Sequence, residues 1–399
     1  MIWAQNEKGM VSMKIGFIGL GNIGMPMALQ LVKAGFEVYG KNRSPGKEQT
    51  FIERGGKAGL SLGQLAAEMD IVITCLPMPA DVEEVYLAES GLLANAREGL
   101  IVIDCSTVST ALSRRLFERS EEARAKFLDA PVSGGTAAAE NGTLSIMVGG
   151  RRDVFDRVSA AGVFDAMGKN IYYVGEAGSG SAVKLINQLM VGIHTQAFSE
   201  AFALGRASNL DPDTLFTILN SSLAQSKIME RHYTLYMAKD SYDPGFAIKL
   251  LSKDLNLVAE TAAASNVRLP VGGRVQSLLG RAEGEYGALD MSGMAVYQAD
   301  GDRRLREEGA LKHFAVFLPM LDAEKSALYR EEHLRFLDER RAAGMLHANG
   351  RFVDGAGGLV IYRASSYDEV ERWVRQDPYI VKGARRYEIH EWDIVLADR

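Results

Sequence analysis

The feature that most constrains the fold is GFIGLGNIGMPMALQLVKAG, residues 16–35, in which Gly19, Gly21 and Gly24 are spaced as G-x-G-x-x-G. No residue from 15 to 32 is charged, so the segment is long enough to resemble a membrane span. Its glycines, however, crowd into the first half, between an apolar run and a helical pattern. The first glycine permits a tight turn, the second lets the backbone approach a pyrophosphate, and the third allows close packing of helix on strand. The segment therefore predicts a dinucleotide-binding loop and not a membrane span.

Short apolar runs alternate with amphipathic segments over the first part of the chain. The amphipathic segments include residues 26–35 and 109–126, and the apolar runs are residues 14–20, 37–42, 70–76, 100–106, 127–133 and 144–150. Strands that alternate with helices predict βαβ units and a mostly parallel sheet covered on both faces. We therefore expect an α/β Rossmann domain over residues 14–175.

The pattern changes twice after this region. Residues 176–305 show helical patterns without strand signals, which predicts an all-α domain. Residues 306–399 predict a small ferredoxin-like α+β domain of order βαββαβ. Its expected strands are 313–321, 347–353, 357–364 and 387–397, and its expected helices are 323–344 and 365–376. Residues 1–13 lack periodicity and are expected to be a disordered extension.

Composition excludes several classes of function. The formal net charge is −6 and basic residues are scattered, so nucleic acid and anionic membrane surfaces are not expected partners. The six histidines and two cysteines form no HxH, HExxH or CxxC motif, which argues against a metal site. Both cysteines lie in apolar runs, as expected for reduced residues in a cytoplasmic protein.

The second predicted strand ends in Lys41, Asn42 and Arg43, where NAD-binding folds usually carry an acidic residue. A carboxylate at this position would repel a ribose 2′-phosphate, whereas a guanidinium group binds it. The sequence therefore favours NADP over NAD, with NAD still possible. The alternative is that Lys41, Arg43 and Lys47 only solubilise a turn.

Several separate motifs resemble the β-hydroxyacid dehydrogenases, a family that includes 3-hydroxyisobutyrate dehydrogenase and 2-hydroxy-3-oxopropionate reductase. The motifs are GFIGLGNIGMPMA, DCSTVS, DAPVSGGTAAAENGTLSIMVGG, GSGSAVKLINQ and FAIKLLSKDLNLV, within residues 14–299. The resemblance implies an oxidoreductase that interconverts a small 3-hydroxy acid and its semialdehyde. It does not single out the substrate.

The resemblance also implies the site residues. Lys184, in an apolar helix where desolvation lowers a lysine pKa, is the expected general acid and base. Asn187 lies one turn further on, and Gln188 stands where the family often repeats the amide, so either amide is a candidate for the substrate contact. Ser133, Gly134 and Gly135 are expected to hold a substrate carboxylate in a nest of backbone N–H groups. The alternatives are that Lys184 is a snorkelling surface lysine and that Gly134 and Gly135 only form a turn.

The expected cofactor-binding residues come from the glycine loop, the end of the second strand and the loops beside the nicotinamide. They are Gly19, Leu20, Gly21, Asn22, Ile23, Gly24, Asn42, Arg43, Ser44, Leu76, Pro77, Thr107 and Lys253. Lys253 is also expected to reach the substrate, whereas Asp254 is interpreted as fixing its helix. His194 and His232 are interpreted as ordinary helix residues.

Residues 311–397 resemble the YCII family, small ferredoxin-like domains that pair into α/β barrels. Some members are thought to use a His–Asp pair, and here His333 has Asp354 or Asp377 as candidate partners. The helix pattern places His333 beside Tyr329 and Leu337, so a packing role is also open. Dimerisation or substrate handover is favoured over catalysis for this domain. This domain is a departure from the dehydrogenase family.

Two further readings remain open. The chain could be a bifunctional enzyme whose YCII-like domain carries an isomerase or lyase activity, or a non-catalytic nucleotide-binding sensor, against which Lys184 argues. The long apolar helices and the open sheet predict two self-association surfaces, hence a homodimer or tetramer.

Overall fold

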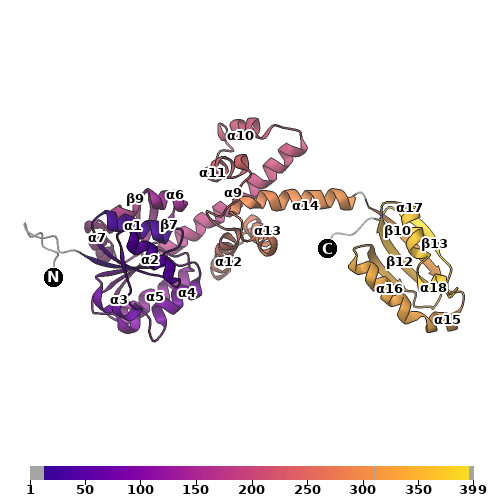
Figure 1. Ribbon diagram of the computed structural model, residues 1–399, viewed down its shortest axis with the longest axis horizontal. Helices are drawn as coiled ribbons and strands as arrows, with labels where there is room; N and C mark the ends of the chain where they lie inside the picture. The colour runs from indigo at the N-terminus through magenta and orange to yellow at the C-terminus, as the bar shows by residue number, and fades with distance from the viewer. Residues whose placement is uncertain (1–12, 310, 395–399) are drawn as a thin grey trace, which may run out of the picture. The chain divides into compact units, whose positions relative to one another are not determined.

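The structure is a computed structural model that describes residues 13–309 and 311–394 (Figure 1). Apart from Met13, the extension expected at residues 1–13 lies outside the described residues. The chain divides into two compact units, residues 1–298 and residues 299–399, called here the first and the second unit.

In the described part of the first unit, nine strands form one sheet in the order β3-β2-β1-β4-β5-β6-β8-β7, with β9 pairing on β8. The strands are β1 (Lys14–Ile18), β2 (Glu37–Lys41), β3 (Lys57–Ala58), β4 (Ile71–Thr74), β5 (Ile101–Asp104), β6 (Lys126–Asp129), β7 (Val132–Ser133), β8 (Leu144–Gly150) and β9 (Gly168–Gly175). From β3 through β6 all neighbours are parallel. This confirms the predicted Rossmann arrangement.

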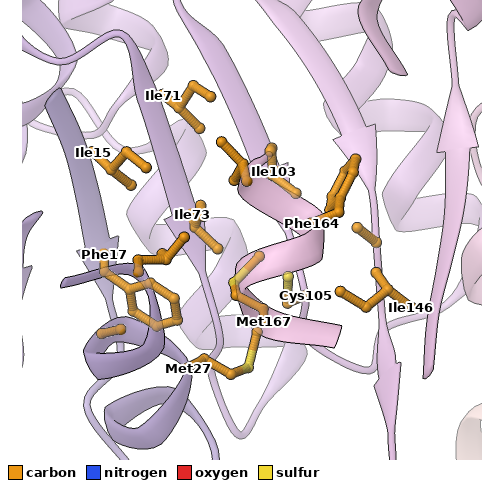
Figure 2. Close-up of a cluster of buried hydrophobic side chains, with 14 of the residues drawn as sticks. Ile15, Phe17, Met27, Ile71, Ile73, Ile103, Cys105, Ile146, Phe164 and Met167 are labelled. Carbon is orange, nitrogen blue, oxygen red and sulfur yellow. The ribbon is translucent and has the colours of Figure 1, made fainter. Parts of the chain in front are cut away.

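Helices cover both faces of this sheet. They are α1 (Gly24–Lys33), α2 (Pro45–Glu53), α3 (Leu62–Glu68), α4 (Pro79–Leu87), α5 (Thr110–Glu122), α6 (Gly135–Glu140), α7 (Arg152–Ala160) and α8 (Val163–Met167), with a short 3₁₀ turn at Leu93–Asn95. Alternate residues of β4 enter different cores: Ile71 and Ile73 face one, and Val72 faces the other. Figure 2 shows the core that contains Ile71 and Ile73, to which Phe164 and Met167 of α8 also belong. Burial on both faces explains why these strands read as continuous apolar runs.

The structure corrects two details of the expected sheet. The run at residues 127–133 is two strands, because Pro131 interrupts it; β6 pairs with β5, and both β6 and β7 lie antiparallel to β8. Strand β9 was not predicted, and it lies parallel to β8. Three of its residues, Lys169, Asn170 and Tyr172, are exposed and polar or aromatic, so it lacks the apolar pattern of a buried strand.

The rest of the first unit is helical, as predicted. Its helices are α9 (Ser179–Ala207), α10 (Pro212–Asn220), α11 (Lys227–Leu235), α12 (Ile248–Ala264) and α13 (Pro270–Tyr286), with 3₁₀ turns at Met237–Lys239 and Met291–Gly293. Helix α14 (Met294–Gly309) begins in the first unit and ends in the second. Leu185 of α9 packs with Leu251 and Leu255 of α12 and with Leu279 of α13 in one core. This core fixes the two helices that carry the candidate site.

The second unit has the predicted ferredoxin-like topology. Its strands are β10 (Lys312–Pro319), β11 (Leu346–Arg351), β12 (Gly357–Ala364) and β13 (Glu388–Trp392), in the antiparallel order β11-β12-β10-β13. The expected single helix at residues 323–344 is two helices, α15 (Ala323–Leu328) and α16 (Arg330–Ala342), with a break at Tyr329. Helix α17 (Tyr367–Val374) matches the prediction, and α18 (Pro378–Val381) is an additional turn. Part of the last expected strand, residues 395–397, lies outside the described residues.

Candidate active site

The glycine loop connects β1 to α1 with the geometry its sequence predicts. Gly19 has a φ of +101°, and a Cβ there would collide with the carbonyl oxygen of Cys75, so only glycine fits. A Cβ on Gly24 would collide with the carbonyl oxygen of Gly19. By contrast, a Cβ on Gly21 would have no neighbour within 4 Å. Leu20 is buried and Asn22 is exposed, so the loop presents open backbone next to the helix N-terminus, the place where phosphates bind.

The end of β2 supports this loop. The Oδ1 atom of Asn42 accepts a hydrogen bond from the backbone N–H of Leu20 at 3.0 Å, and the N–H of Asn42 donates to Glu48 at 2.9 Å. The Arg43 side chain is 87% exposed and lies 3.5 Å from Asp81. Ser44 is the residue before α2. Asn42 therefore holds the glycine loop in place, while the guanidinium group of Arg43 extends into solvent beside it.

The loops after β4 and β5 are tied to each other. The Thr74 hydroxyl donates to Asp104 at 2.7 Å, and the backbone N–H of Leu76 donates to the Ser106 hydroxyl at 2.9 Å. Asp104 is fully buried, and burial raises its pKa. These contacts fix the position of Leu76, next to Pro77, and of Ser106, next to Thr107. Asp104 was not among the predicted site residues, although a carboxylate at the end of an apolar strand is a visible signal.

The turn from β7 to α6 contains Ser133, Gly134 and Gly135, for which the sequence predicts a carboxylate nest. Ser133 is the last residue of β7 and pairs with Ser145 of β8. Gly135 is the first residue of α6. Gly134 has a φ of +140°, a conformation that favours glycine. Gly134 and Gly135 are exposed, so their backbone N–H groups are accessible at the start of a helix.

Asp129 ties the sheet to α9. Its carboxylate accepts the backbone N–H groups of Gly178 and Ser181, both at 2.8 Å. Burial raises the pKa of Asp129 to about 6, although these two hydrogen bonds act to lower it. Sequence reasoning missed this role, because the partners lie 49 and 52 residues away.

Lys184 lies on the second turn of α9 and is 8% exposed. Its Nζ atom donates to Oε1 of Gln188 at 2.9 Å. Burial lowers the pKa of Lys184 to about 8; Lys253 lowers it further, and Asp254 opposes the shift. A lysine of this kind exchanges a proton near neutral pH, as a general acid and base must.

A chain of polar contacts extends from Lys184 to the sheet. Asn187 donates to Oε1 of Gln188 at 3.0 Å, and Nε2 of Gln188 donates to Asp254 at 2.6 Å. The Nζ atom of Lys253 lies 2.8 Å from Asp254 and donates to the backbone carbonyl of Thr107 at 3.0 Å. Asp254 thus does more than fix its own helix: it joins α12 to α9. The structure brings Lys184, Asn187, Lys253 and Thr107 into one network.

Among the histidines of the helical region, His232 is fully buried. Its Nε2 atom lies 3.0 Å from the Thr195 hydroxyl, its ring packs edge-on against Phe198, and burial lowers its pKa to about 3. These contacts are those of a core residue.

In the second unit, His333 is paired with Asp377 and not with Asp354. Its Nδ1 atom lies 2.8 and 2.9 Å from the two carboxylate oxygens of Asp377, and its ring stacks on Tyr379 at 3.9 Å. Arg385 lies over the ring of Tyr379. Asp354 instead accepts the backbone N–H of Ala356 within the β11–β12 turn.

Among the described residues, no group of three or more His, Cys, Asp or Glu side chains could hold a metal ion. None of the helices within residues 13–309 and 311–394 is long and apolar enough to cross a membrane.

Three family models match most of the described chain. Residues 14–175 match the NAD-binding domain of 6-phosphogluconate dehydrogenase, residues 178–297 the NAD-binding domain of NADP-dependent 3-hydroxyisobutyrate dehydrogenase, and residues 309–393 the YCII-related domain. A 2-(hydroxymethyl)glutarate dehydrogenase from Eubacterium barkeri is 37% identical over 70% of this chain and 93% of its own length. The 2-hydroxy-3-oxopropionate reductase of Escherichia coli is 36% identical over 71% and 96%.

Solved structures agree with these relatives. The 3-hydroxyisobutyrate dehydrogenase of Mycobacterium tuberculosis, described with L-serine, has a TM-score of 0.66 and 30% identity, covering 72% of this chain and 99% of that one. The corresponding protein of Salmonella typhimurium has a TM-score of 0.66 and 28% identity, covering 71% and 99%. The chain therefore belongs to the 3-hydroxyisobutyrate dehydrogenase family of NAD(P)-dependent hydroxy acid oxidoreductases, and a YCII-related domain follows its dehydrogenase unit.

Proposed function

We propose that this protein is an NADP-dependent oxidoreductase that interconverts a small 3-hydroxy acid and its semialdehyde, with Lys184 as general acid and base. The observation that carries the proposal is the buried amine of Lys184, which is hydrogen-bonded to Gln188. Lys184 lies one helical turn before Asn187. Through Asp254 and Lys253 the same network contacts the loop after β5. The amine is thus linked to the edge of the sheet where Rossmann folds bind their ligand.

The glycine loop fits a dinucleotide. The open space beside the backbone of Gly21 leaves room for a pyrophosphate. The loop keeps this shape because Gly19 and Gly24 carry no side chain, which would collide with neighbouring backbone. When bound, the nicotinamide supplies or accepts the hydride. The exposed guanidinium group of Arg43, next to the loop that Asn42 supports, supports binding of a 2′-phosphate and hence NADP.

The substrate class follows from the protein groups. The N–H groups around Ser133, Gly134 and Gly135 suit a carboxylate. Lys184 removes the proton of the hydroxyl group during oxidation and returns one to the carbonyl oxygen during reduction. The relative named 2-hydroxy-3-oxopropionate reductase supports this class of substrate.

The test is a panel of tartronate semialdehyde, methylmalonate semialdehyde, succinic semialdehyde and the matching hydroxy acids, each assayed with NADP and NAD by nicotinamide absorbance. We expect turnover with at least one pair and a preference for NADP. Absence of turnover across the panel would contradict the proposed reaction, and a preference for NAD would contradict only the role of Arg43.

A second candidate activity is favoured by the His333–Asp377 contact, which fixes the orientation of the imidazole ring as in many acid–base dyads. In this alternative the YCII-related domain carries a separate isomerase or lyase reaction. It is tested in Lys184→Ala, where the dehydrogenase step is removed, by proton NMR of the same metabolites without cofactor. Conversion that disappears in Lys184→Ala/His333→Ala would support it, and identical spectra for the two variants would contradict it.

A further inference from the structure

Gln188 lies at the centre of the contacts around Lys184. Its Oε1 atom accepts from Nζ of Lys184 at 2.9 Å and from Nδ2 of Asn187 at 3.0 Å, and its Nε2 atom donates to Oδ2 of Asp254 at 2.6 Å. The side chain is 3% exposed. It thus joins two residues of α9 to one residue of α12.

Chemistry fixes the orientation of this amide. A lysine ammonium has only donors, and an ionised carboxylate has only acceptors. The carbonyl oxygen of Gln188 must therefore face Lys184, and its NH₂ group must face Asp254, since a flipped amide would set donor against donor and acceptor against acceptor. Because Gln188 presents its oxygen, Asn187 must in turn present its NH₂ group.

A count of hydrogen bonds then separates the two amides. Gln188 uses both lone pairs of Oε1 and one of its two N–H donors, so a ligand could receive at most one hydrogen bond from it. Within the described residues, Asn187 uses one N–H donor. Its second N–H and both lone pairs of Oδ1 are left for another partner, and its side chain is only partly buried.

We propose that Gln188 is a positioning residue, which orients the amine of Lys184 and the amide of Asn187 and connects them to Asp254, and that Asn187 is the amide that contacts the substrate. This inference rests on the proposed function. It resolves which of the two neighbouring amides faces the substrate, a choice that the sequence left open.

The charged and titratable groups around Lys184 explain why a neutral connector matters. Asp254 and Lys253 act on its pKa from α12, with opposite signs, and Cys75 acts from the end of β4. A glutamine between Lys184 and Asp254 keeps the carboxylate out of direct contact with the ammonium. Direct contact would favour the charged amine and move its proton exchange away from neutral pH.

The first test is Gln188→Glu, which keeps the side-chain length and an oxygen toward Lys184 but places a negative charge beside it. The pKa of Lys184 should rise by about one pH unit or more. It is measured by ¹³C NMR titration of lysine-labelled protein, with the signal assigned by its loss in Lys184→Arg. This measurement needs no turnover, so it stands even if the proposed function fails. An unchanged titration of Lys184 would overturn the positioning role.

The second test separates positioning from substrate contact. Gln188→Leu should lower kcat by about tenfold or more with little change in the KM of the cofactor, since a misplaced catalytic group costs rate. Asn187→Ala should mainly raise the KM of the hydroxy acid. If Gln188→Leu instead raises that KM more than Asn187→Ala does, the assignment of the two amides is wrong.

The matched control is Gln196→Leu, which removes another buried glutamine of α9 whose amide donates to Glu200 at 2.8 Å, away from Lys184. It should leave kcat and the Lys184 titration unchanged. If Gln188→Leu does not fold, as judged by circular dichroism, the shorter Gln188→Asn takes its place. That side chain cannot span from Lys184 to Asp254, so the same loss of kcat is expected, and wild-type kcat in this variant would overturn the proposal.

Discussion

The two units each contain a buried basic side chain beside an aspartate, but they join the pair differently. In the first unit the amide of Gln188 separates Lys184 from Asp254. In the second unit His333 contacts both oxygens of Asp377 directly. A buried base without direct contact to its counter-charge is destabilised as a cation, whereas a paired one satisfies its carboxylate and supports the local fold. The difference teaches that two bases buried beside an aspartate can differ in whether the carboxylate contacts them directly.

The sharpest way to break this comparison is to remove each base in turn. Lys184→Ala should lower turnover by roughly 10² or more while cofactor binding stays within a few fold, because general acid–base catalysis is lost. His333→Ala should leave dehydrogenase turnover unchanged. Steady-state kinetics and cofactor titration measure both effects, and the exposed lysine in Lys249→Ala serves as the matched control. Near wild-type turnover in Lys184→Ala would contradict the catalytic role.

Much of this contrast could be foreseen from the sequence, but not its connections. The glycine loop, the buried strands and the lysine in an apolar helix are local patterns, so the Rossmann fold and the position of Lys184 were predictable. The Gln188–Asp254 contact joins residues 66 positions apart, and it depends on how α9 packs on α12. Likewise, sequence could not choose Asp377 over Asp354, because only the fold places one of them beside His333. The catalytic roles themselves stay predictions.

Stability should respond to the two bases with opposite signs. The folded-state pKa of Lys184, about 8, lies below its ordinary value of 10.5, so the folded protein binds fewer protons than the unfolded chain between these values. The resulting penalty, on the order of 3 kcal/mol, is fully present below pH 8 and shrinks as the pH rises toward 10.5. Lys184→Met should therefore raise the free energy of unfolding at pH 7 by about 1–2 kcal/mol, after loss of its hydrogen bond to Gln188.

The paired histidine should behave in the other direction. His333→Leu leaves the buried carboxylate of Asp377 with the backbone N–H of Tyr379 but without its side-chain partner, and should destabilise the second unit by about 1–3 kcal/mol. Thermal unfolding at pH 7 and pH 10 measures both variants. A destabilised Lys184→Met protein, or a gain that does not shrink at high pH, would contradict the explanation from burial.

A third prediction concerns the cofactor side of the first unit. Arg43→Ala should raise the KM for NADPH by about tenfold or more, because loss of a charge-assisted contact to a phosphate costs roughly 1.5–3 kcal/mol. The KM for NADH should barely change. Lys47→Ala, an exposed cation of α2, is the control and should alter neither value. Equal changes with the two cofactors would show that Arg43 does not distinguish them.

The smallest expected effect concerns the assembly of the chain into oligomers. In the second unit, Phe314, Val316 and Leu318 of β10 face the core, so Phe317 and its neighbours lie on the opposite face of the sheet. Phe317 is 37% exposed there and contacts Phe352 and His390. An apolar face of this kind favours burial against a second copy.

We therefore expect a homodimer at least, with a tetramer possible, because the long helix α9 also exposes Ile186, Met190 and Leu204. Deletion of residues 306–399 should cause partial loss of assembly, since the helices of the first unit would still associate. Phe317→Glu should have the same effect by placing a charge on the sheet face, whereas Tyr367→Glu at an exposed aromatic position of α17 should not. Light scattering at micromolar concentration is the measurement. A monomeric full-length chain would refute the prediction of assembly, and an unchanged oligomer in both the deletion and Phe317→Glu would assign assembly to the helices of the first unit alone.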